Sequence, residues 1–479
     1  MKNKNLIIGA IVLSLVVLLA TGTYAYWTIT KSQDGANTLI GGCLNVDITV
    51  ESAGINLEKT WPISDFDGMQ LEGYTFTVTN YCDTPQDYRI DLDRLVDSEG
   101  RKEMSNEYLA TLLDYGVPVM YEELETGETT VEDVKEKRVL AYDTVAGKVG
   151  DEPGSNTHTL RLWIDEESPV SEQGSTFLSR VEINAGQGIE KYYTPEECFT
   201  FDESTGSITA YDVSCGGTDV VIPYNINNVA VTQIGASAFR EKGLTSVEFP
   251  RSVTTIENMA FMGNQTLEKI IFKNGLLSIG QRAFAGINNA TVLTFISLPD
   301  SLTTIGLNAF MKTSIKQIII PDNVNSLGAN AFISSKIENL IIGKGIKEIG
   351  NHTFRHNEIK KVVIPDNITS IGQYSFGDNP IEEITFGTGV TSIGTVAFAS
   401  FGPSEKYYNQ NFLSEIFIPS NITTLETGVF KDTTSDVIIR TERTKADFLE
   451  NVTTSSSTAL GNWYGNAQVI SSDNLYIYE

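Results

Sequence analysis

Hydrophobic positions in the second half of the chain recur with a nearly fixed period. Phenylalanine returns in steps of 22, 23, 26, 22, 22, 22, 22 and 32 residues, and an Ile-Gly or Leu-Gly pair precedes most of these positions. In the unit 359–376, Ile359, Val362 and Ile364 predict a short strand that ends at Pro365, because proline cannot donate to a β-ladder. The recurring phenylalanines are Phe239, Phe261, Phe284, Phe310, Phe332, Phe354, Phe376, Phe398 and Phe430.

A unit of about 22 residues is too small to bury its own apolar face, so neighbouring units must stack into a solenoid. Ile371 and Phe376 are expected to point inward, and Gly372 is expected to permit the backbone conformation of a turn. The longer steps contain insertions at 287–290 and 402–411, which are predicted to be surface loops. The pattern predicts repeats over residues 216–435.

This order of strand, proline, turn, Ile-Gly and Ala-Phe resembles the BspA-like family of leucine-rich repeats. Residues 198–211 are similar to the amino-terminal cap of that family, so 191–215 is expected to close one end of the solenoid. Residues 436–479, with Trp463 and Tyr464, are expected to close the other end. The resemblance implies a secreted or cell-surface binding protein, often called an adhesin, with no particular ligand.

One residue of each predicted strand should point outward, between the inward-facing positions. Five of these eight positions are apolar, so we expect a partner-binding stripe, because large exposed apolar patches mark contact sites. The alternative is that β-branched side chains merely suit a strand. The outward positions are Glu248, Ile271, Ser297, Ile319, Ile341, Val363, Thr385 and Phe417, and the candidate binding residues are Ile271, Ile319, Ile341, Val363 and Phe417.

The first half alternates apolar and polar residues in short runs, which predicts an antiparallel β-sandwich over residues 26–190. The stretch 103–113 is expected to be a short helix. The predicted strands are 44–50, 74–79, 88–92, 139–142, 160–164 and 180–183.

Leu160-Arg-Leu-Trp-Ile-Asp-Glu, the run 173–177 and the run 181–187 resemble the camelysin/TasA family. The leader ending in Thr-Gly-Thr-Tyr-Ala-Tyr-Trp27 is similar to that of exported proteins with a dedicated signal peptidase. This resemblance implies a jelly-roll domain and, for some members, fibre assembly in a biofilm matrix or a metallopeptidase activity.

The amino terminus predicts export. Lys2 and Lys4 precede the apolar run 6–20, and small residues end at Ala25, as in a signal peptide covering residues 1–25. The alternative is an uncleaved membrane anchor that continues to Trp27. In both cases the rest of the chain lies outside the cytoplasm.

The charge distribution excludes nucleic acid as a partner. The chain has a formal net charge of −27, and residues 28–197 alone carry 34 acidic and 13 basic side chains. A surface of this kind cannot neutralise a phosphate backbone. The expected partner is a protein or glycan ligand on the repeat face.

The chain has four cysteines, and an exported chain favours two disulfides. We expect each pair to lie within one domain, Cys43 with Cys82 and Cys198 with Cys215. Buried free thiols are the alternative. No Cys-x-x-Cys spacing is present, so the cysteines indicate neither zinc nor redox chemistry.

Candidate catalytic chemistry is sparse, and we expect neither an enzyme nor a cofactor. His352 and His356 are four residues apart, but no Glu follows the first, and the segment falls in a predicted repeat turn. His158 is the only histidine of the acidic half, which excludes a two-His zinc site there. The fragments 65–68 and 91–93 resemble calcium ligands without the EF-hand spacing, so calcium binding stays open.

The sequence therefore predicts an adhesin or matrix component, with a camelysin-type metallopeptidase or fibre-forming subunit as the alternative. If cleavage follows Ala25, the mature chain begins with the alternating run 26–31. Such a strand is suited to completing the sheet of a neighbouring molecule, although pairing within its own domain is the commoner outcome. Self-assembly through the amino-terminal domain is thus a further hypothesis.

Overall fold

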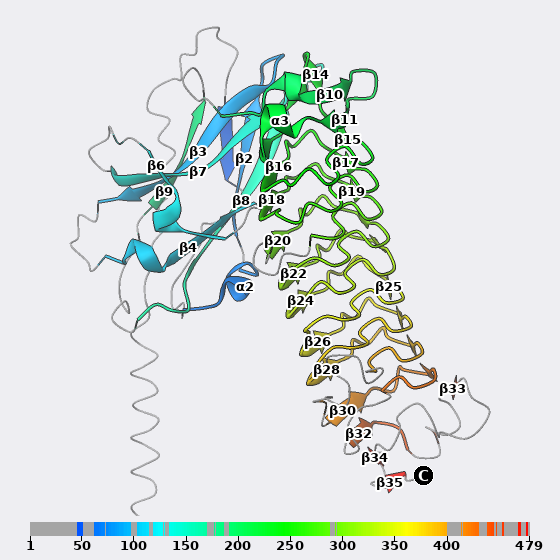
Figure 1. Cartoon of the computed structure of the whole chain (residues 1–479). Helices are drawn as coiled ribbons and strands as arrows, with labels where there is room; N and C mark the ends of the chain where they lie inside the picture. The colour runs from blue at the N-terminus through cyan, green and yellow to red at the C-terminus, as the bar shows by residue number, and fades with distance from the viewer. Residues whose placement is uncertain are drawn as a thin grey trace, which may run out of the picture. The chain divides into compact units, whose positions relative to one another are not determined.

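The computed structural model (Figure 1) forms two compact units, Met1–Tyr192 and Tyr193–Glu479. The predicted leader, residues 1–25, lies outside the described residues. Across the described parts of the chain, no helix is long and apolar enough to cross a membrane. The described residues are 46–50, 62–71, 73–96, 103–114, 118–127, 129, 134–169, 177, 179–185, 191–287, 293, 295–399, 413, 415–430, 438–444, 447, 453–454, 468–470 and 476–477.

The first unit contains two antiparallel sheets. One has the strand order β1(Val46–Val50)-β2(Tyr74–Asn80)-β8(Gly154–Ile164)-β4(Leu109–Leu113)-β5(Val119–Met120). The other has the order β6(Glu125–Gly127)-β7(Val134–Val145)-β3(Gln86–Leu95)-β9(Ser179–Ala185). The short helical turns are α2(Asp65–Gly68), η1(Asn106–Tyr108) and η2(Tyr121–Glu123).

Both sheets contribute to one hydrophobic core, as the alternating pattern predicts. Every second residue of β2 is buried, and Phe76 and Val78 are fully inaccessible. They belong to the same cluster as Tyr88 and Ile90 of β3. The predicted sandwich is confirmed, and the predicted strands fall on β1, β2, β3, β7, β8 and β9.

The predicted helix at 103–113 is wrong. This stretch contains the single turn η1 and then strand β4, which pairs with β8 on one side and β5 on the other. Residues 109–112 are all buried. Burial between two strands outweighs the local helical pattern, because ladder hydrogen bonds on both edges and packing on both faces decide the conformation.

The second unit is a β-solenoid of about nine turns. Its first ladder consists of short parallel strands, β12(Asp219–Val221), β16(Ser246–Glu248), β18(Lys269–Ile271), β20(Phe295–Ser297), β22(Gln317–Ile319), β24(Asn339–Ile341), β26(Lys361–Val363), β28(Glu383–Thr385) and β30(Glu415–Ile418). The second ladder consists of two-residue strands, β15(Gln233–Ile234), β17(Thr255–Ile256), β19(Ser278–Ile279), β21(Thr304–Ile305), β23(Ser326–Leu327), β25(Glu348–Ile349), β27(Ser370–Ile371), β29(Ser392–Ile393) and β31(Thr424–Leu425).

The recurring phenylalanines form a stacked spine inside the solenoid. From Phe239 to Phe430, successive ring centroids lie 4.8 to 5.7 Å apart, with nearly parallel planes. Most of these rings are fully inaccessible. Each turn thus buries its apolar face against its two neighbours, which gives a core that grows one coil at a time.

The turn chemistry differs from the expectation for Gly372. Gly372 does not have a positive φ; a Cβ there would lie 2.7 Å from Asn351 Oδ1 and 2.8 Å from the Gly350 carbonyl carbon, so glycine is needed for close coil-to-coil approach. The left-handed residue comes two positions later, at Tyr374, with φ 55°. The equivalent position before each earlier or later spine phenylalanine is also left-handed: Ser237, Met259, Arg282, Asn308, Asn330, His352, Val396 and Gly428.

Two kinds of turn, one with proline and one with glycine, follow the first-ladder strands. Pro365 and Asp366 of one coil lie over Gly387 and Gly389 of the next, where a Cβ would come within 2.4 Å of the Pro365 carbonyl oxygen or 2.0 Å of that of Asp366. The Asp366 carboxylate accepts a hydrogen bond from the Thr388 N–H at 2.7 Å. The same arrangement recurs 44 residues earlier, at 321–322 and 343–345. Coils therefore interlock in pairs.

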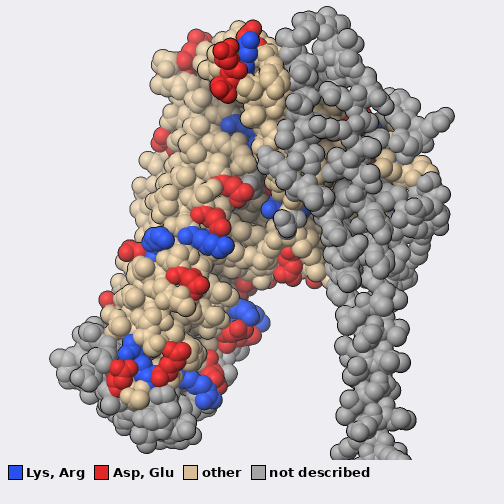
Figure 2. All heavy atoms as spheres, turned by 180° about the vertical axis from the view of Figure 1, so that it is seen from behind, with Lys and Arg blue, Asp and Glu red and all other residues tan. Residues whose placement is uncertain are grey.

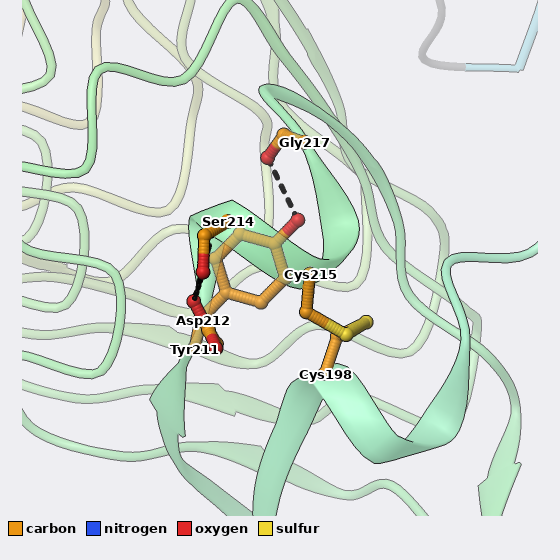
Figure 3. The surroundings of a disulfide bond; sticks show 6 residues. All are labelled: Cys198, Tyr211, Asp212, Ser214, Cys215 and Gly217. Carbon is orange, nitrogen blue, oxygen red and sulfur yellow. Dashed lines mark hydrogen bonds between the residues drawn. A yellow bond between two sulfur atoms is a disulfide. The ribbon is translucent and has the colours of Figure 1, made fainter.

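A cap begins the solenoid. The hairpin of β10(Phe199–Asp202) and β11(Ser207–Tyr211) pairs with β15, and a disulfide joins Cys198 to Cys215 at the end of η4(Glu196–Cys198) and in α3(Val213–Gly216), the pair expected from the sequence. Figure 3 shows the bond beside Tyr211, whose hydroxyl donates to the Gly217 carbonyl. The Tyr211 ring stacks on Phe239 at 4.9 Å, so the cap starts the aromatic spine.

At the far end, the first ladder continues beyond residue 435. β30 pairs in parallel with β32(Ile438–Thr441), which pairs with β34(Gln468–Ile470), and β35(Tyr476–Ile477) then pairs antiparallel. The second ladder ends at β33(Thr453–Thr454). Trp463 and Tyr464 lie outside the described residues. A small hairpin, β13(Asn225–Ile226) and β14(Val229–Ala230), precedes β15.

Candidate binding surface

The first-ladder strands place one residue in the core and its neighbours outside. In β22, Ile318 is fully buried, whereas Ile319 is half-buried and faces outward. Side chains alternate along a strand, so register pairing of the buried residues also aligns the outward ones. The buried central residues are Val220, Val247, Ile270, Ile296, Ile318, Val362, Ile384 and Ile416.

The predicted binding residues lie in one outward row, which we call the strand-face row (Ile271, Ile319, Ile341, Val363 and Phe417). Ile319 and Ile341 are register partners in paired strands. The ladder is interrupted between β18 and β20, between β24 and β26 and between β28 and β30, and Val363 lies opposite Thr385 in the pair β26–β28. The last two residues of the row are the most exposed: Val363 is 51% exposed and Phe417 is 46% exposed, whereas Ile271, Ile319 and Ile341 are half-buried.

Charged side chains beside the row are paired with each other. Lys316 bonds Glu338 of the next coil at 3.0 Å, and Lys361 bonds Glu383 at 3.0 Å. These pairs are largely exposed, so each contributes little to stability. Because each pair contains one positive and one negative side chain, the pairs add no net charge to this face. In the view of Figure 2, acidic and basic side chains are likewise interspersed on the largely uncharged solenoid surface.

The two ends of the row also lie beside ion pairs. Ile271 is the register partner of Glu248, whose carboxylate contacts the buried Lys273 ammonium at 3.0 Å. Phe417 is the register partner of Arg440, which pairs with Glu415. The result is an apolar row with a polar border, the composition found in the centre and rim of protein contact surfaces.

The repeats match a known family. Residues 232–295 and 288–402 match the BspA type Leucine rich repeat region, in six copies. These residues are BspA-type leucine-rich repeats. The match lies wholly inside the second unit, so it carries no information on the camelysin/TasA resemblance of the first.

Solved structures are also similar to the chain. A leucine-rich repeat protein from Bacteroides ovatus is 23% identical, with 57% of this chain and 69% of that chain covered and a TM-score of 0.47. A leucine rich cell surface protein from Faecalibacterium prausnitzii is 22% identical, with 56% and 95% covered and a TM-score of 0.23. The pneumococcal vaccine antigen PcpA is 16% identical, with 60% and 93% covered and a TM-score of 0.25. None of the curated proteins compared with the chain matches it.

The histidine pair of the BspA-type repeats does not form a helical metal site. His352 and His356 are both left-handed turn residues, on either side of Phe354. The His352 ring stacks on Tyr374 at 4.9 Å, and His356 lies 3.7 Å from the Asp378 carboxylate. Burial, together with the charges of Arg355 and His356, lowers the pKa of His352. The two histidines are thus held by contacts with Tyr374 and Asp378 of the next coil.

The first unit buries several polar groups. His158 lies between the Tyr88 hydroxyl, 2.6 Å from Nε2, and the Asp114 carboxylate, 2.6 Å from Nδ1. Asn156 donates to the same Tyr88 hydroxyl at 2.9 Å. Both ring nitrogens thus have protein partners, so this histidine stabilises the sandwich and offers no lone pair to a ligand.

The calcium-like fragments have structural roles. Asp65 lies in α2, where it accepts from the Trp163 indole at 3.2 Å, and burial raises its pKa. Asp91 and Asp93 lie on β3 and are paired with basic side chains, Arg89 and Lys137 respectively. Within the described ranges, no group of three His, Cys, Asp or Glu side chains could hold a metal ion. The predicted Cys43–Cys82 pair includes a residue outside those ranges and stays a prediction.

Sequence reasoning missed a set of buried asparagines beside the spine, which we call the asparagine ladder (Asn264, Asn357 and Asn379). The Asn357 amide donates to the carbonyls of Phe332 and Phe354, both at 2.9 Å, and its oxygen accepts from the N–H groups of Ser335 and Ile337. Asn264 and Asn379 repeat this pattern. Each stands three residues after a spine phenylalanine, which is the signal that could have identified it.

Proposed function

We propose that the chain is an exported binding protein that holds a protein or glycan partner on the strand-face row of its BspA-type repeats. The observation that carries the proposal is the register alignment of Ile319 with Ile341 on the outside of the first ladder, with Val363 at the same position of the next coil. The leader-like segment 1–25 supports placement outside the cytoplasm, at the cell surface or in the medium.

The energetics support contact with a partner. Covering the paired charges beside the row contributes little to the binding free energy. Burying the apolar side chains of Ile319, Ile341 and Val363 contributes about 25 cal/mol per Å² of apolar area removed from water. The solenoid backbone is rigid, because every coil is anchored by the spine. A partner would therefore meet a preformed surface and lose little binding free energy to rearrangement of the repeats.

No enzymatic role is part of this proposal. The camelysin-type metallopeptidase alternative needs a metal site in the first unit, and the fibre-subunit alternative needs the segment 26–31, which lies outside the described residues. Element analysis of the purified chain tests the first alternative. Light scattering over a concentration series, with and without residues 26–31, tests the second.

The direct test replaces Ile319, Ile341 and Val363 together by Thr, which keeps β-branching and removes the apolar surface. The control replaces Leu277 and Leu307, 46% and 39% exposed outside this row, by Thr. Binding of the full chain to glycan arrays and to immobilised extracellular proteins is compared. We expect the triple variant to lose at least tenfold in affinity, about 1.4 kcal/mol, with the control unchanged. Equal binding by the triple variant and the wild type would contradict the proposal.

A further inference from the structure

The four-stranded sheet of the first unit contains a buried lysine among carboxylates. Lys137 of β7 contacts Glu182 of β9, and its Nζ lies 3.6 Å from Asp91 Oδ2 and 3.6 Å from Asp93 Oδ1, both of β3. The two aspartate side chains are fully inaccessible, and that of Lys137 is 10% exposed. An amine and carboxyl groups are thus held together on three adjacent strands, with Lys137, Asp91 and Asp93 away from bulk water and Glu182 36% exposed.

The strand register brings one pair directly opposite. Asp93 and Lys137 are register partners of the antiparallel strands β3 and β7. Such partners have Cβ atoms about 4.5–5.5 Å apart, a separation that the two side chains can span with a covalent bond. The Nζ of Lys137 lies 3.6 Å from Asp93 Oδ1, so the amine is held beside the carboxyl group that it would attack.

The two aspartates differ in chemistry. Asp91 accepts two hydrogen bonds from Arg89, both at 2.8 Å, and a third from Asn184 at 2.8 Å. These donors bind both carboxylate oxygens of Asp91 and fix this side chain against Arg89 and Asn184. Asp93 is the register partner of Lys137 and lies beside its Nζ, so Asp93 is the carboxyl group placed for attack by the amine.

We propose that Lys137 and Asp93 form an intramolecular amide cross-link, with Glu182 as the acceptor of the amine proton. The neutral Nζ attacks Cγ of Asp93, a C–N bond forms, and a C–O bond breaks. Two protons leave the nitrogen, one to Glu182 before the attack and one after it, and both are transferred to the leaving oxygen. An ammonium and a carboxylate thus give an amide and one water molecule. No oxidant, metal or second protein is required.

The protonation state sets the rate of this step. Burial lowers the pKa of Lys137, but Glu182, Asp93 and Asp91 raise it, and the outcome is a raised pKa. The amine is therefore protonated at rest, and its proton must reach a carboxylate before attack. Exclusion of water favours that transfer, because an unscreened ion pair loses its hydration. The bond is expected to form slowly after folding and to persist on unfolding.

Peptide mapping of the full chain under reducing, denaturing conditions tests the proposal. We expect a branched peptide that joins the segments containing Asp93 and Lys137, lighter than their sum by one water molecule. Lys137→Arg keeps the positive charge and should abolish the branched peptide. Glu182→Gln should reduce its amount at least tenfold at a fixed time after purification.

Lys135→Arg is the matched control on the same strand, since Lys135 is half-exposed and pairs with Glu103. It should leave the cross-link intact. Only linear Asp93 and Lys137 peptides from wild-type protein kept for days at neutral pH would overturn the proposal and show an ordinary ion pair. That result is decided on the wild type alone, so it does not depend on whether any variant folds.

Discussion

The two units of the chain are both β-structures, but they bury different groups. The solenoid buries a column of phenylalanines and aliphatic residues, with buried asparagines that serve the backbone. The sandwich buries ionisable side chains beside its apolar core, with His158 between Tyr88 and Asp114 and with Lys137 between Asp91 and Asp93.

This difference follows from topology. A coil contacts only its neighbours, so its interior must be the same in every repeat, and variation is confined to the outside. A sandwich brings together strands that are distant in sequence, so a unique buried cluster can form once and be kept. The repeats are therefore suited to presenting a surface, and the sandwich to holding a specific polar or covalent arrangement.

The largest expected effect comes from breaking the spine. Phe310 is fully buried and stacks on Phe284 at 5.4 Å and on Phe332 at 5.3 Å. Phe310→Ala should lower the free energy of unfolding of the solenoid by about 3–5 kcal/mol, through lost burial and a cavity. Hydrogen exchange read by mass spectrometry should show faster exchange in adjacent coils and unchanged exchange in the sandwich. Faster exchange in the sandwich as well would contradict the conclusion that the solenoid and the sandwich have independent cores.

The cap disulfide has the next largest effect. Cys198 and Cys215 are 17 residues apart, and cross-linking a loop of this size adds about 3 kcal/mol in the chain-entropy account. Replacing both by Ser should lower the stability of the first coils, where Tyr211 meets Phe239, more than that of the last coils. Chemical denaturation followed by hydrogen exchange measures this gradient. A uniform loss along the solenoid would contradict a local cap.

The asparagine ladder gives a smaller effect. Asn357→Ala leaves two buried N–H groups and two buried carbonyls without that partner, and should cost about 1–3 kcal/mol. Asn323 is exposed and donates to one carbonyl, that of Asp300, so Asn323→Ala should cost less than about 0.5 kcal/mol. Urea unfolding of both variants makes the comparison. Equal costs would show that the buried amide is not needed.

A left-handed turn position offers a stabilising change. Lys312 is exposed with φ 54°, at the place where other coils have Gly263 and Gly286. Lys312→Gly should raise the stability of the solenoid by about 1 kcal/mol, because a Cβ in this conformation is unfavourable. Lys312→Ala keeps the Cβ and should give no gain in thermal unfolding. A gain for the alanine variant would rule out backbone strain as the cause.

The smallest expected effect is a difference between the two units in how their stability depends on pH. Hydrogen bonds from the Thr388 N–H and hydroxyl lower the pKa of Asp366, so its contribution is present above the unfolded value and is lost as pH falls through the folded value. Burial raises the pKa of Asp65, so the sandwich gains from protonation of that group as pH falls. Acid titration below about pH 4, followed by hydrogen exchange, should loosen the Asp366 turn first. Asp366→Asn should remove that pH dependence.

Much of the solenoid could be predicted from the sequence, because its period, its strands and its outward row repeat visibly. The left-handed positions could not, since Ser237, Met259 and Val396 share a conformation without sharing a side-chain type. The reason why residue 372 is glycine could not be predicted either, because the close approach of a neighbouring coil depends on the tertiary structure.

In the sandwich, the alternating runs predicted most strands and missed β4. The meeting of Asp93, Lys137 and Glu182 depends on the register of three strands, and the bulges in β3 shift that register. No spacing of residues in the sequence predicts that these three side chains meet. The same holds for Asp114 and His158, which are 44 residues apart.

Carbene footprinting of the full chain, alone and with a partner captured on an array, tests the binding account most directly. The account predicts protection at Ile319, Ile341 and Val363, with unchanged labelling at Leu277 and Leu307. Protection confined to the spine turns or to the first unit, with the strand-face row labelled as before, would contradict it.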